Sequence, residues 1–283
     1  MLKNKTEKQP FVSVVIATYN REKYIRKAIE SILNQTYKNI EVIIIDDSST
    51  NETQDIISGF NQKDTRIVYI RNKHRIGFVK SLNKGIRIAG GNYIARLDDD
   101  DFWCDCQKLE KQIRFLEGHP EYILTGGGII IINEGGQEIQ RYLNPETDKE
   151  IRDAMLFECP ISHGAVVFRK DAWKKVGGYN EKPCVPEDWD LWCQFGKFGK
   201  MYNFPEYFLI FLGGQQNKTK YIVRKNLKNK LELRRKYRND YPNFFRNILY
   251  GEICYFYSFL PSSFRQFLKP ITSKIRQIIF NPF

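Results

Sequence analysis

Residues 11–47 read FVSVVIATYNREKYIRKAIESILNQTYKNIEVIIIDD, and this stretch decides the fold. Its two apolar runs, 11–17 and 40–45, show little alternation, which is typical of strands that are covered on both faces. Between these runs, apolar residues recur at helical spacing from Glu22 to Asn34. A strand, a helix and a strand in this order predict a βαβ unit with two parallel strands.

The alternation of strands and helices continues along the chain. Further strands are predicted at 66–71, 92–97, 123–133 and 164–169, and further helices at 53–60, 77–89, 108–116, 149–157, 171–176 and 187–198. We therefore expect an α/β fold with a Rossmann-like, mostly parallel sheet flanked by helices. Ligands of such sheets bind at the carboxyl ends of the strands, so the residues that follow each strand are the first candidates for a site.

Four consecutive aspartates, Asp98–Asp101, follow the predicted strand at 92–97. Carboxylates packed within a few ångströms raise one another's pKa unless a cation or hydrogen bonds compensate. Oxygen ligands suit a hard divalent cation such as Mg²⁺ or Mn²⁺, and Asp98 and Asp100 lie on the same face of an extended segment. A cation site is therefore one interpretation of this run, and a solvated acidic loop is the other.

Polar and aromatic residues also follow the first two strands. Asp46 and Asp47 end the strand at 40–45, and Tyr19 follows the strand at 11–17. A carboxylate here can accept hydrogen bonds from a base or a ribose, but Asp also favours turns and helix caps. The Tyr19 ring can stack on a base, an interaction worth ~1–3 kcal/mol. These residues are candidates for nucleotide recognition.

Glu187 and Asp188 open the predicted helix at 187–198. A capping role is one interpretation, because acidic residues are favourable in the first turn of a helix. A catalytic base is the other, since a carboxylate fixed at a helix start can have its pKa tuned by its surroundings.

Charge is divided unevenly between two parts of the chain. Residues 1–214 hold 30 Lys and Arg against 30 Asp and Glu, whereas residues 215–283 hold 15 against 3, the entire net charge of +12. We therefore expect a body at 11–214, with a nucleotide-binding half at 11–103 and an acceptor half at 104–214, after an N-terminal tail at 1–10.

The C-terminal segment, 215–283, is predicted to be a basic, amphipathic, mostly helical extension. A basic helix is predicted near 221–238, and apolar residues recur at helical spacing from Phe264 to Ile279. Such a segment either packs on the body or lies on an anionic membrane surface. A protein that coats nucleic acid is disfavoured, because the body is neutral and its strand ends are acidic.

Cysteines, histidines and the N-terminus argue against several other classes. The six cysteines form no CxxC and no ligand-spaced pair with the three histidines, which disfavours a zinc site. The N-terminus is charged and lacks the apolar stretch of a secretory signal, and no apolar run approaches the ~20 residues that span a bilayer. We expect a cytoplasmic protein that is peripheral to the inner face of the membrane.

Four stretches together resemble the family 2 inverting glycosyltransferases of the GT-A fold. They are SVVIATYNREKYIRKAIESILNQTYKNIEVIIIDDSSTNET (13–53), KSLNKGIRIAGGNYIARLDDDDFW (80–103), HGAVVFRKDAWKKVGGYNE (163–181) and EDWDLWCQF (187–195). Their order and separation also match, so the resemblance covers about residues 10–213. It implies transfer of a sugar from a nucleotide-diphospho-sugar, with UDP-sugars expected first, to a glycan or lipid-linked acceptor in cell-surface polysaccharide or glycoconjugate synthesis.

The resemblance also implies roles for individual residues. The nucleotide pocket is lined by Thr18, Tyr19, Asn20 and Arg21, with Tyr19 against the uracil, while Asp47, supported by Asp46, reads the base or ribose. Asp100 binds Mn²⁺ or Mg²⁺ as one member of a DxD pair with Asp98, and Asp98 or Asp99 holds ribose or phosphate. Asp188 is the general base, with Glu187 beside it, and Gly177-Gly178-Tyr179 flanks the acceptor site.

The chain departs from the family pattern at several positions. Gln194 stands where arginine is frequent, and Cys106 stands where relatives often have proline. No Q/RxxRW motif follows Glu187-Asp188, which argues against processive synthesis. The roles of Arg75, Lys80 and His163 remain open at this stage.

Two other enzyme classes are disfavoured by the loop after the first strand. A sugar nucleotidyltransferase would need a glycine-rich phosphate loop there, but the loop reads ATYNR (17–21) and holds no glycine. An oxidoreductase of Rossmann type fails for a similar reason, because it needs a GxGxxG sequence.

Overall fold

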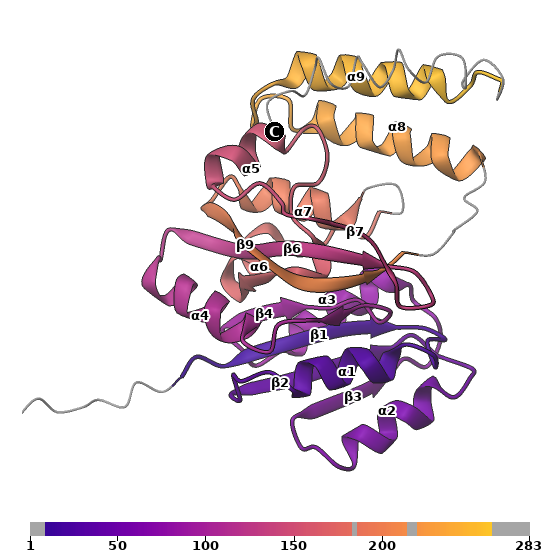
Figure 1. The fold of residues 1–283 in the computed structure, drawn as a ribbon, viewed down its shortest axis with the longest axis vertical. Helices are drawn as coiled ribbons and strands as arrows, with labels where there is room; N and C mark the ends of the chain where they lie inside the picture. Colours follow the sequence, from indigo (N-terminus) through magenta and orange to yellow (C-terminus); the bar gives the residue numbers. More distant parts are fainter. Residues whose placement is uncertain (1–8, 183–185, 214–219, 262–283) are drawn as a thin grey trace, which may run out of the picture. The chain divides into compact units, whose positions relative to one another are not determined.

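A computed structural model describes residues 9–182, 186–213 and 220–261 of the chain (Figure 1). Contacts divide the chain into two compact units. The first unit comprises Met1–Ile151, Pro160–Glu181 and Glu187–Gly214, and the second comprises Arg152–Cys159, Lys182–Pro186 and Gln215–Phe283. Two short segments from within the predicted body, 152–159 and 182–186, thus belong to the second unit.

One mixed sheet organises the first unit. Its strands are β1 (Val12–Thr18), β2 (Ile40–Asp46), β3 (Ile67–Arg71), β4 (Tyr93–Arg96), β5 (Phe102–Trp103), β6 (Tyr122–Ile132), β7 (Glu138–Tyr142), β8 (Val167–Arg169) and β9 (Lys200–Leu212). The order is β3-β2-β1-β4-β8-β6-β9-β5, with β7 beside β6. The four strands β1 to β4 pair in parallel, as does β6 with β9, and the remaining pairs are antiparallel. The α/β class is confirmed, and antiparallel pairing is concentrated in the second half of the sheet.

Helices connect and cover these strands (Figure 1). They are α1 (Ile25–Leu33), α2 (Thr53–Asn61), α3 (Phe78–Ile88), α4 (Lys108–Gly118), α5 (Asp148–Ala154), which crosses into the second unit, α6 (Lys170–Val176) and α7 (Glu187–Phe195), with a 3₁₀ turn at His163–Ala165. Every residue of β1 is buried, as the unbroken apolar run predicts. Helix α3 approaches β1 very closely, since a Cβ at Gly85 would lie 2.7 Å from Cγ1 of Val15.

The second half of the sheet contains strands that the sequence pattern does not predict. β9 is the longest of them, and it contains Pro205, which cannot donate a hydrogen bond to a neighbouring strand. The pairing with β6 explains how this proline is accepted. Phe204 pairs with Gly127 and Tyr207 with the next residue, Gly128, so Pro205 lies in a bulge of the ladder. The predicted strand at 164–169 is also shorter, because its first residues form the 3₁₀ turn.

The second unit contains α8 (Lys220–Lys236) and α9 (Phe244–Tyr257). The Arg234 side chain is buried and donates hydrogen bonds to the carbonyls of Leu156 and Phe157 at 2.7 and 2.6 Å. The Phe157 ring packs on Tyr250 of α9. The segment 152–159 is therefore fastened to the basic helix α8 and to α9. The apolar repeat predicted from Phe264 to Ile279 lies outside the described residues.

Candidate active site

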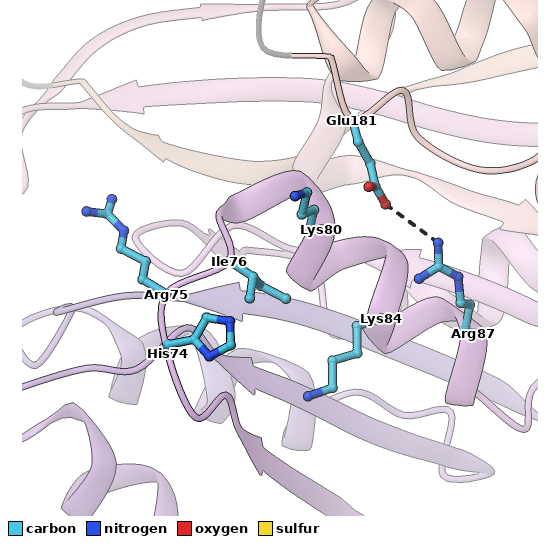
Figure 2. Close-up of a pocket in the computed structure, with 7 residues that line it drawn as sticks. All are labelled: His74, Arg75, Ile76, Lys80, Lys84, Arg87 and Glu181. Atoms are coloured by element: carbon cyan, nitrogen blue, oxygen red, sulfur yellow. Dashed lines mark ion pairs between the residues drawn. The ribbon is translucent and has the colours of Figure 1, made fainter.

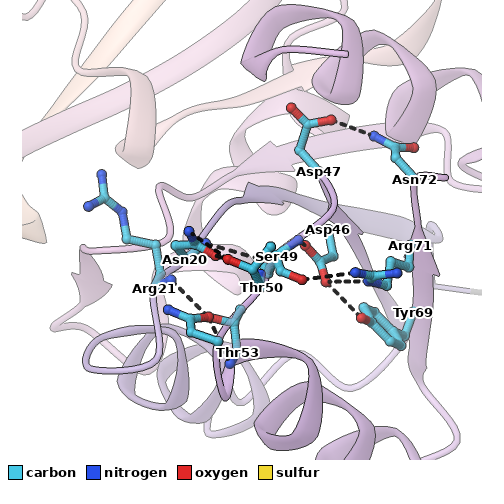
Figure 3. A network of polar contacts seen from close by, with 11 residues as sticks. Asn20, Arg21, Asp46, Asp47, Ser49, Thr50, Thr53, Tyr69, Arg71 and Asn72 are labelled. Carbon is cyan, nitrogen blue, oxygen red and sulfur yellow. Dashed lines mark hydrogen bonds and ion pairs between the residues drawn. The ribbon is translucent and has the colours of Figure 1, made fainter. Parts of the chain in front are cut away.

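The loops after β1 and β2 are fastened to each other at the carboxyl edge of the sheet (Figure 3). Asn20 adopts a left-handed conformation with φ 55°, which Asn tolerates better than most residues. Its backbone N–H donates to Ser49 Oγ at 3.0 Å, and its side-chain oxygen accepts from the Thr50 N–H at 2.9 Å. The Arg21 N–H donates to Thr53 Oγ1 at 2.8 Å. Two of the predicted nucleotide-pocket residues therefore also hold the loops in shape.

Asp46 is buried with its carboxylate bound to the protein. It accepts hydrogen bonds from the Ser49 N–H and the Tyr69 hydroxyl, both at 2.8 Å, and Arg71 Nε lies 3.8 Å away. These contacts hold the loop after β2 against β3, and the support that Asp46 gives to nucleotide recognition stays a prediction. No part of its side chain is exposed.

Asp47 is also buried, and three donors face its carboxylate. The Ile76 and Gly77 N–H groups donate at 2.8 Å, and Asn72 Nδ2 donates at 2.9 Å. Burial raises the pKa of Asp47, but these hydrogen bonds outweigh burial, so its pKa is lowered. The carboxylate fixes the loop before α3, and its predicted contact with a base or ribose stays a prediction.

Tyr19 lies partly exposed at the end of β1, and Arg75 covers one face of its ring. The Arg75 guanidinium carbon is 4.1 Å from the ring centre. The preceding residue, Thr18, is buried, and its carbonyl accepts a hydrogen bond from the Asp47 N–H at 2.8 Å. The sequence left the roles of two basic residues, Arg75 and Lys80, open. Both line a pocket along α3 (Figure 2), and Arg75 also contacts the predicted base-stacking residue.

Two arginines neutralise part of the aspartate run. Arg21 Nε lies 3.2 Å from Asp99 and its Nη2 lies 3.4 Å from Asp100, while Arg96 Nη2 lies 2.5 Å from Asp98. Arg96, which is fully buried on β4, is not among the residues predicted for the site. Its signal in the sequence is a cation in an otherwise apolar strand.

The pKa values of the run show that its negative charge is only partly compensated. Burial raises the pKa of Asp99 to about 6 despite Arg21, and burial together with Asp98 and Asp100 raises the pKa of Asp101 to about 8. Burial also acts on Asp98, but the charge and the hydrogen bond of Arg96, together with the other charged neighbours of Asp98, outweigh it and lower the pKa of Asp98. A further cation in this place would offset the remaining charge.

The carboxylates of the aspartate run fit a divalent cation that takes its remaining ligands from water and from the substrate. Within the chain that the structure describes, no group of three or more His, Cys, Asp or Glu side chains could hold a metal ion. Mg²⁺ is usually held by one or two carboxylates together with water and substrate phosphates. The Asp100 side chain is 31% exposed, so its carboxylate is accessible to such an ion.

Asp188 and Glu187 lie in the first turn of α7, where Trp189 and Trp192 anchor the helix in the interior. Asp188 Oδ1 accepts a hydrogen bond from the Trp189 N–H at 2.7 Å. Burial raises the pKa of Asp188 to about 7, and the charges of Glu187 and Asp98 add to this effect. The fold thus brings the predicted base within electrostatic reach of the aspartate run, 90 residues away in the sequence.

His163 pairs with the buried Tyr179 near the same carboxylates. His163 Nε2 lies 2.7 Å from the Tyr179 hydroxyl oxygen. Burial, helped by Arg96, lowers the pKa of His163 to about 3, so its imidazole is neutral at pH 7. The backbone of Tyr179 is fixed by Asn83 of α3, which donates to its carbonyl and accepts from its N–H, both at 2.9 Å. The structure therefore fastens the Gly177-Gly178-Tyr179 turn to α3.

Structural comparison places the fold among known glycosyltransferases. S. aureus TarS 1–349 in complex with UDP-GlcNAc superimposes with a TM-score of 0.67 at 15% identity, covering 95% of this chain and 80% of that one. The mannosyltransferase PcManGT from Pyrobaculum calidifontis, in complex with GDP-Man and Mn²⁺, gives a TM-score of 0.64 at 16% identity over 98% and 77% of the two chains. At these identities the likeness concerns the fold alone.

Sequence comparison identifies the family. An uncharacterized glycosyltransferase of Haemophilus influenzae is 33% identical over 230 residues, which cover 78% of this chain and 71% of that protein. Escherichia coli WfaP, a UDP-Glc:α-D-GlcNAc-diphosphoundecaprenol β-1,3-glucosyltransferase, is 38% identical over 183 residues, or 64% of this chain and 68% of WfaP. The model of the Glycosyl transferase family 2 matches residues 13–177. The chain therefore belongs to glycosyl transferase family 2, and it is a glycosyltransferase.

Proposed function

We propose that the chain transfers one sugar at a time from a UDP-sugar to a hydroxyl of a lipid-linked glycan, with inversion at the anomeric carbon. The observation that carries this proposal is the half-buried Asp188 carboxylate, whose pKa of about 7 suits a general base at neutral pH. The charge of Asp98 contributes to the raised pKa of Asp188, so the two carboxylates lie near each other. Their proximity supports a single site in which Asp188 activates the acceptor and the aspartate run binds the donor.

The proposed reaction is a single in-line displacement. Asp188 accepts the proton of the acceptor hydroxyl while the hydroxyl oxygen forms a bond to the anomeric carbon. The bond between that carbon and the phosphate oxygen breaks with its electron pair, and UDP leaves from the opposite face. Attack from the side opposite to the leaving group inverts the configuration. The proton on Asp188 then passes to solvent.

Other residues of the chain hold the donor. Tyr19 stacks on the uracil, and the loop clamped through Asn20 surrounds the nucleoside. Asp100, with Asp98, would hold Mn²⁺ or Mg²⁺, which supplies positive charge that offsets the charge on the departing diphosphate. Arg21 forms ion pairs with Asp99 and Asp100. It keeps the aspartate run ordered and adds positive charge near the departing diphosphate.

The choice of donor and acceptor rests on relatives. WfaP is named for a UDP-Glc donor and a GlcNAc-diphosphoundecaprenol acceptor. Erwinia amylovora AmsE, named for amylovoran biosynthesis, is 29% identical over 260 residues that cover 90% of this chain. A role in cell-surface polysaccharide or glycoconjugate synthesis follows from these likenesses.

A screen of UDP-, GDP- and dTDP-sugars tests the donor. We expect a UDP-sugar with Mn²⁺ to raise the melting temperature, because a ligand that binds only the folded state stabilises it. The same sugar nucleotide should be hydrolysed slowly without an acceptor. Stabilisation by GDP- or dTDP-sugars alone would contradict the proposed nucleotide.

The second unit supplies the proposed membrane contact. Phe245, Leu249 and Phe256 of α9 are 84%, 59% and 67% exposed, although α9 is not long and apolar enough to cross a bilayer, and neither is any other helix among the described residues. Residues 220–261 hold ten Lys and Arg against three Asp and Glu. We propose that this apolar stripe enters the interface of an anionic membrane, at about 1 kcal/mol for each basic residue near the surface.

Vesicle co-sedimentation tests this contact. Wild type is expected to sediment with phosphatidylglycerol vesicles and much less with phosphatidylcholine vesicles. A F245S/L249S/F256S variant should lose most of the binding, whereas V68S, at an exposed apolar position on β3, should bind like wild type. Equal binding by wild type and the triple variant would reject the membrane contact. We expect no salt-sensitive binding to single-stranded nucleic acid, the alternative use of a basic segment with exposed aromatic rings.

A further inference from the structure

A pocket of about 470 Å³ lies along α3 and the loop before it (Figure 2). Its lining includes His74, Arg75, Lys80, Lys84, Arg87 and Glu181. The volume is in the range of small-molecule sites, which is about 300–1,000 Å³. All of these residues belong to the first unit.

Positive charge dominates this lining. Arg87 pairs with Glu181 at 3.5 Å, and Lys84 Nζ donates to the neutral Asn72 Oδ1 at 2.7 Å. Among the residues that the structure describes, neither Lys80 nor Lys84 forms an ion pair with a carboxylate. The cluster is not a by-product of a basic surface, since residues 1–214 hold equal numbers of acidic and basic side chains.

The positive charges that line the pocket destabilise helix α3. Lys80 and Lys84 are four residues apart on α3, and Arg87 follows three residues later, so like charges occupy neighbouring positions on one face. Like charges at this spacing destabilise a helix by a few tenths of a kcal/mol per pair. An anion in the pocket would remove this repulsion. Several cations that converge on one pocket favour a multiply charged group, and phosphate oxygens match both lysine and arginine donors.

The pocket draws residues from both predicted substrate segments. Arg75 also contacts Tyr19, the predicted base-stacking residue. Glu181 follows the turn that the family resemblance places beside the acceptor, and it accepts a hydrogen bond from Asn83 at 2.9 Å. We propose that this pocket binds the phosphate or diphosphate group of the acceptor. The acceptor part of this inference rests on the proposed function, whereas the phosphate site rests on the pocket alone.

Titration of the full chain with inorganic pyrophosphate tests the site. EDTA is present, so that cation-dependent binding at the aspartate run does not contribute. We expect K80A/R87A to bind pyrophosphate at least about tenfold more weakly than wild type, because two charge-assisted contacts are lost. E181Q keeps the acceptor for Asn83 but removes the opposing charge, so it should bind severalfold more tightly. K63A removes an exposed lysine outside the pocket and should bind like wild type.

Lys84 is kept in these variants because it also holds Asn72, which binds Asp47. Unchanged UDP affinity with Mn²⁺ will show that K80A/R87A is folded. Equal pyrophosphate affinity in wild type, K80A/R87A and E181Q would overturn the site, and so would the absence of binding to wild type.

A kinetic comparison distinguishes the acceptor's phosphate from free phosphate. K80A/R87A should raise KM about tenfold for a sugar linked to a lipid diphosphate, but not for the same sugar on an uncharged octyl chain. Loss of pyrophosphate binding with an unchanged KM would assign the pocket to free phosphate compounds and overturn the acceptor part. Altered pyrophosphate binding without transfer to any acceptor would leave the phosphate site standing and reject the proposed function.

Discussion

Asp47, which follows β2, and Asp188, which lies in the first turn of α7, are the same kind of residue in opposite electrostatic states. Asp47 has three hydrogen-bond donors on its carboxylate and a lowered pKa. Asp188 is half-buried, and its pKa is raised to about 7 by desolvation and by the charges of Glu187 and Asp98. Carboxylates that are satisfied by donors shape the loops, whereas carboxylates that burial and like charge hold at a raised pKa are poised to exchange protons or to meet a cation.

The largest expected effect is on Asp188. D188N should lower kcat by about a thousandfold, since an amide cannot accept the acceptor proton and general bases contribute about 10²–10⁴-fold. UDP affinity should remain, and the free energy of unfolding at pH 8 should be unchanged or higher, because a partly desolvated charge is removed. Steady-state kinetics, UDP titration and urea unfolding measure these effects. D171N, at an exposed position of α6, is the control, and retention of a tenth of wild-type kcat by D188N would refute the assigned base.

Substitution of Asp100 tests the proposed binding of the sugar nucleotide through a divalent cation. D100N should weaken Mn²⁺-dependent UDP binding by about a hundredfold, comparable to the loss of two hydrogen bonds to a charged group. UDP titrations with Mn²⁺ and with EDTA measure this difference. We expect wild type in EDTA and D100N in Mn²⁺ to behave alike. Transfer that is undiminished in EDTA would reject the cation.

Substitution of Asp47 should change the free energy of unfolding in the direction opposite to substitution of Asp188. D47N should lower the free energy of unfolding by about 1–3 kcal/mol, because one amide replaces a carboxylate that satisfies three buried donors. Since its pKa is lowered in the fold, the contribution of Asp47 is present above the ordinary carboxyl pKa, near 4, and is lost as the pH falls through the folded value. Urea unfolding of wild type and D47N between pH 3 and 7 measures it. An unchanged difference across this range would contradict a stabilising carboxylate.

The smallest effect concerns pH. Because the base acts only when ionised, kcat should fall about tenfold for each pH unit below the pKa of Asp188 and level off above it. Burial, together with the charges of Glu187 and Asp98, raises this pKa to about 7, while a cation bound with the sugar nucleotide would oppose these effects and move the midpoint lower. A profile of kcat from pH 5 to 9 measures the midpoint. E187Q removes one raising charge and should shift the midpoint down, and a midpoint that E187Q shifts upward would contradict this explanation.

The sequence predicts the first four strands and their helices well, because each is a local pattern with its own spacing. β1 was expected at 11–17 and lies at Val12–Thr18, and α3 was expected at 77–89 and lies at Phe78–Ile88. β9 was missed because Pro205 and charged residues interrupt its pattern, and only the pairing with β6 makes it a strand.

For the candidate site too, the sequence predicts what local patterns carry and misses what depends on contacts between distant segments. The sequence points to Asp98, Asp100 and Asp188 through their place at the ends of elements and through the family resemblance. It does not reveal that Arg96 neutralises Asp98, or that a neutral His163 lies near that carboxylate. These relations depend on residues that only the assembled sheet brings together.

The hydrogen bonds from Lys84 to Asn72 and from Asn72 to Asp47 join the α3 pocket to the loop that shapes the nucleotide pocket. An anion that draws Lys84 toward itself would weaken its hold on Asn72 and so alter the loop at the other end. Thermodynamic reciprocity then requires UDP and the occupant of the α3 pocket to change each other's affinity by the same factor. The two substrates of the reaction would thus be energetically coupled before any bond is made.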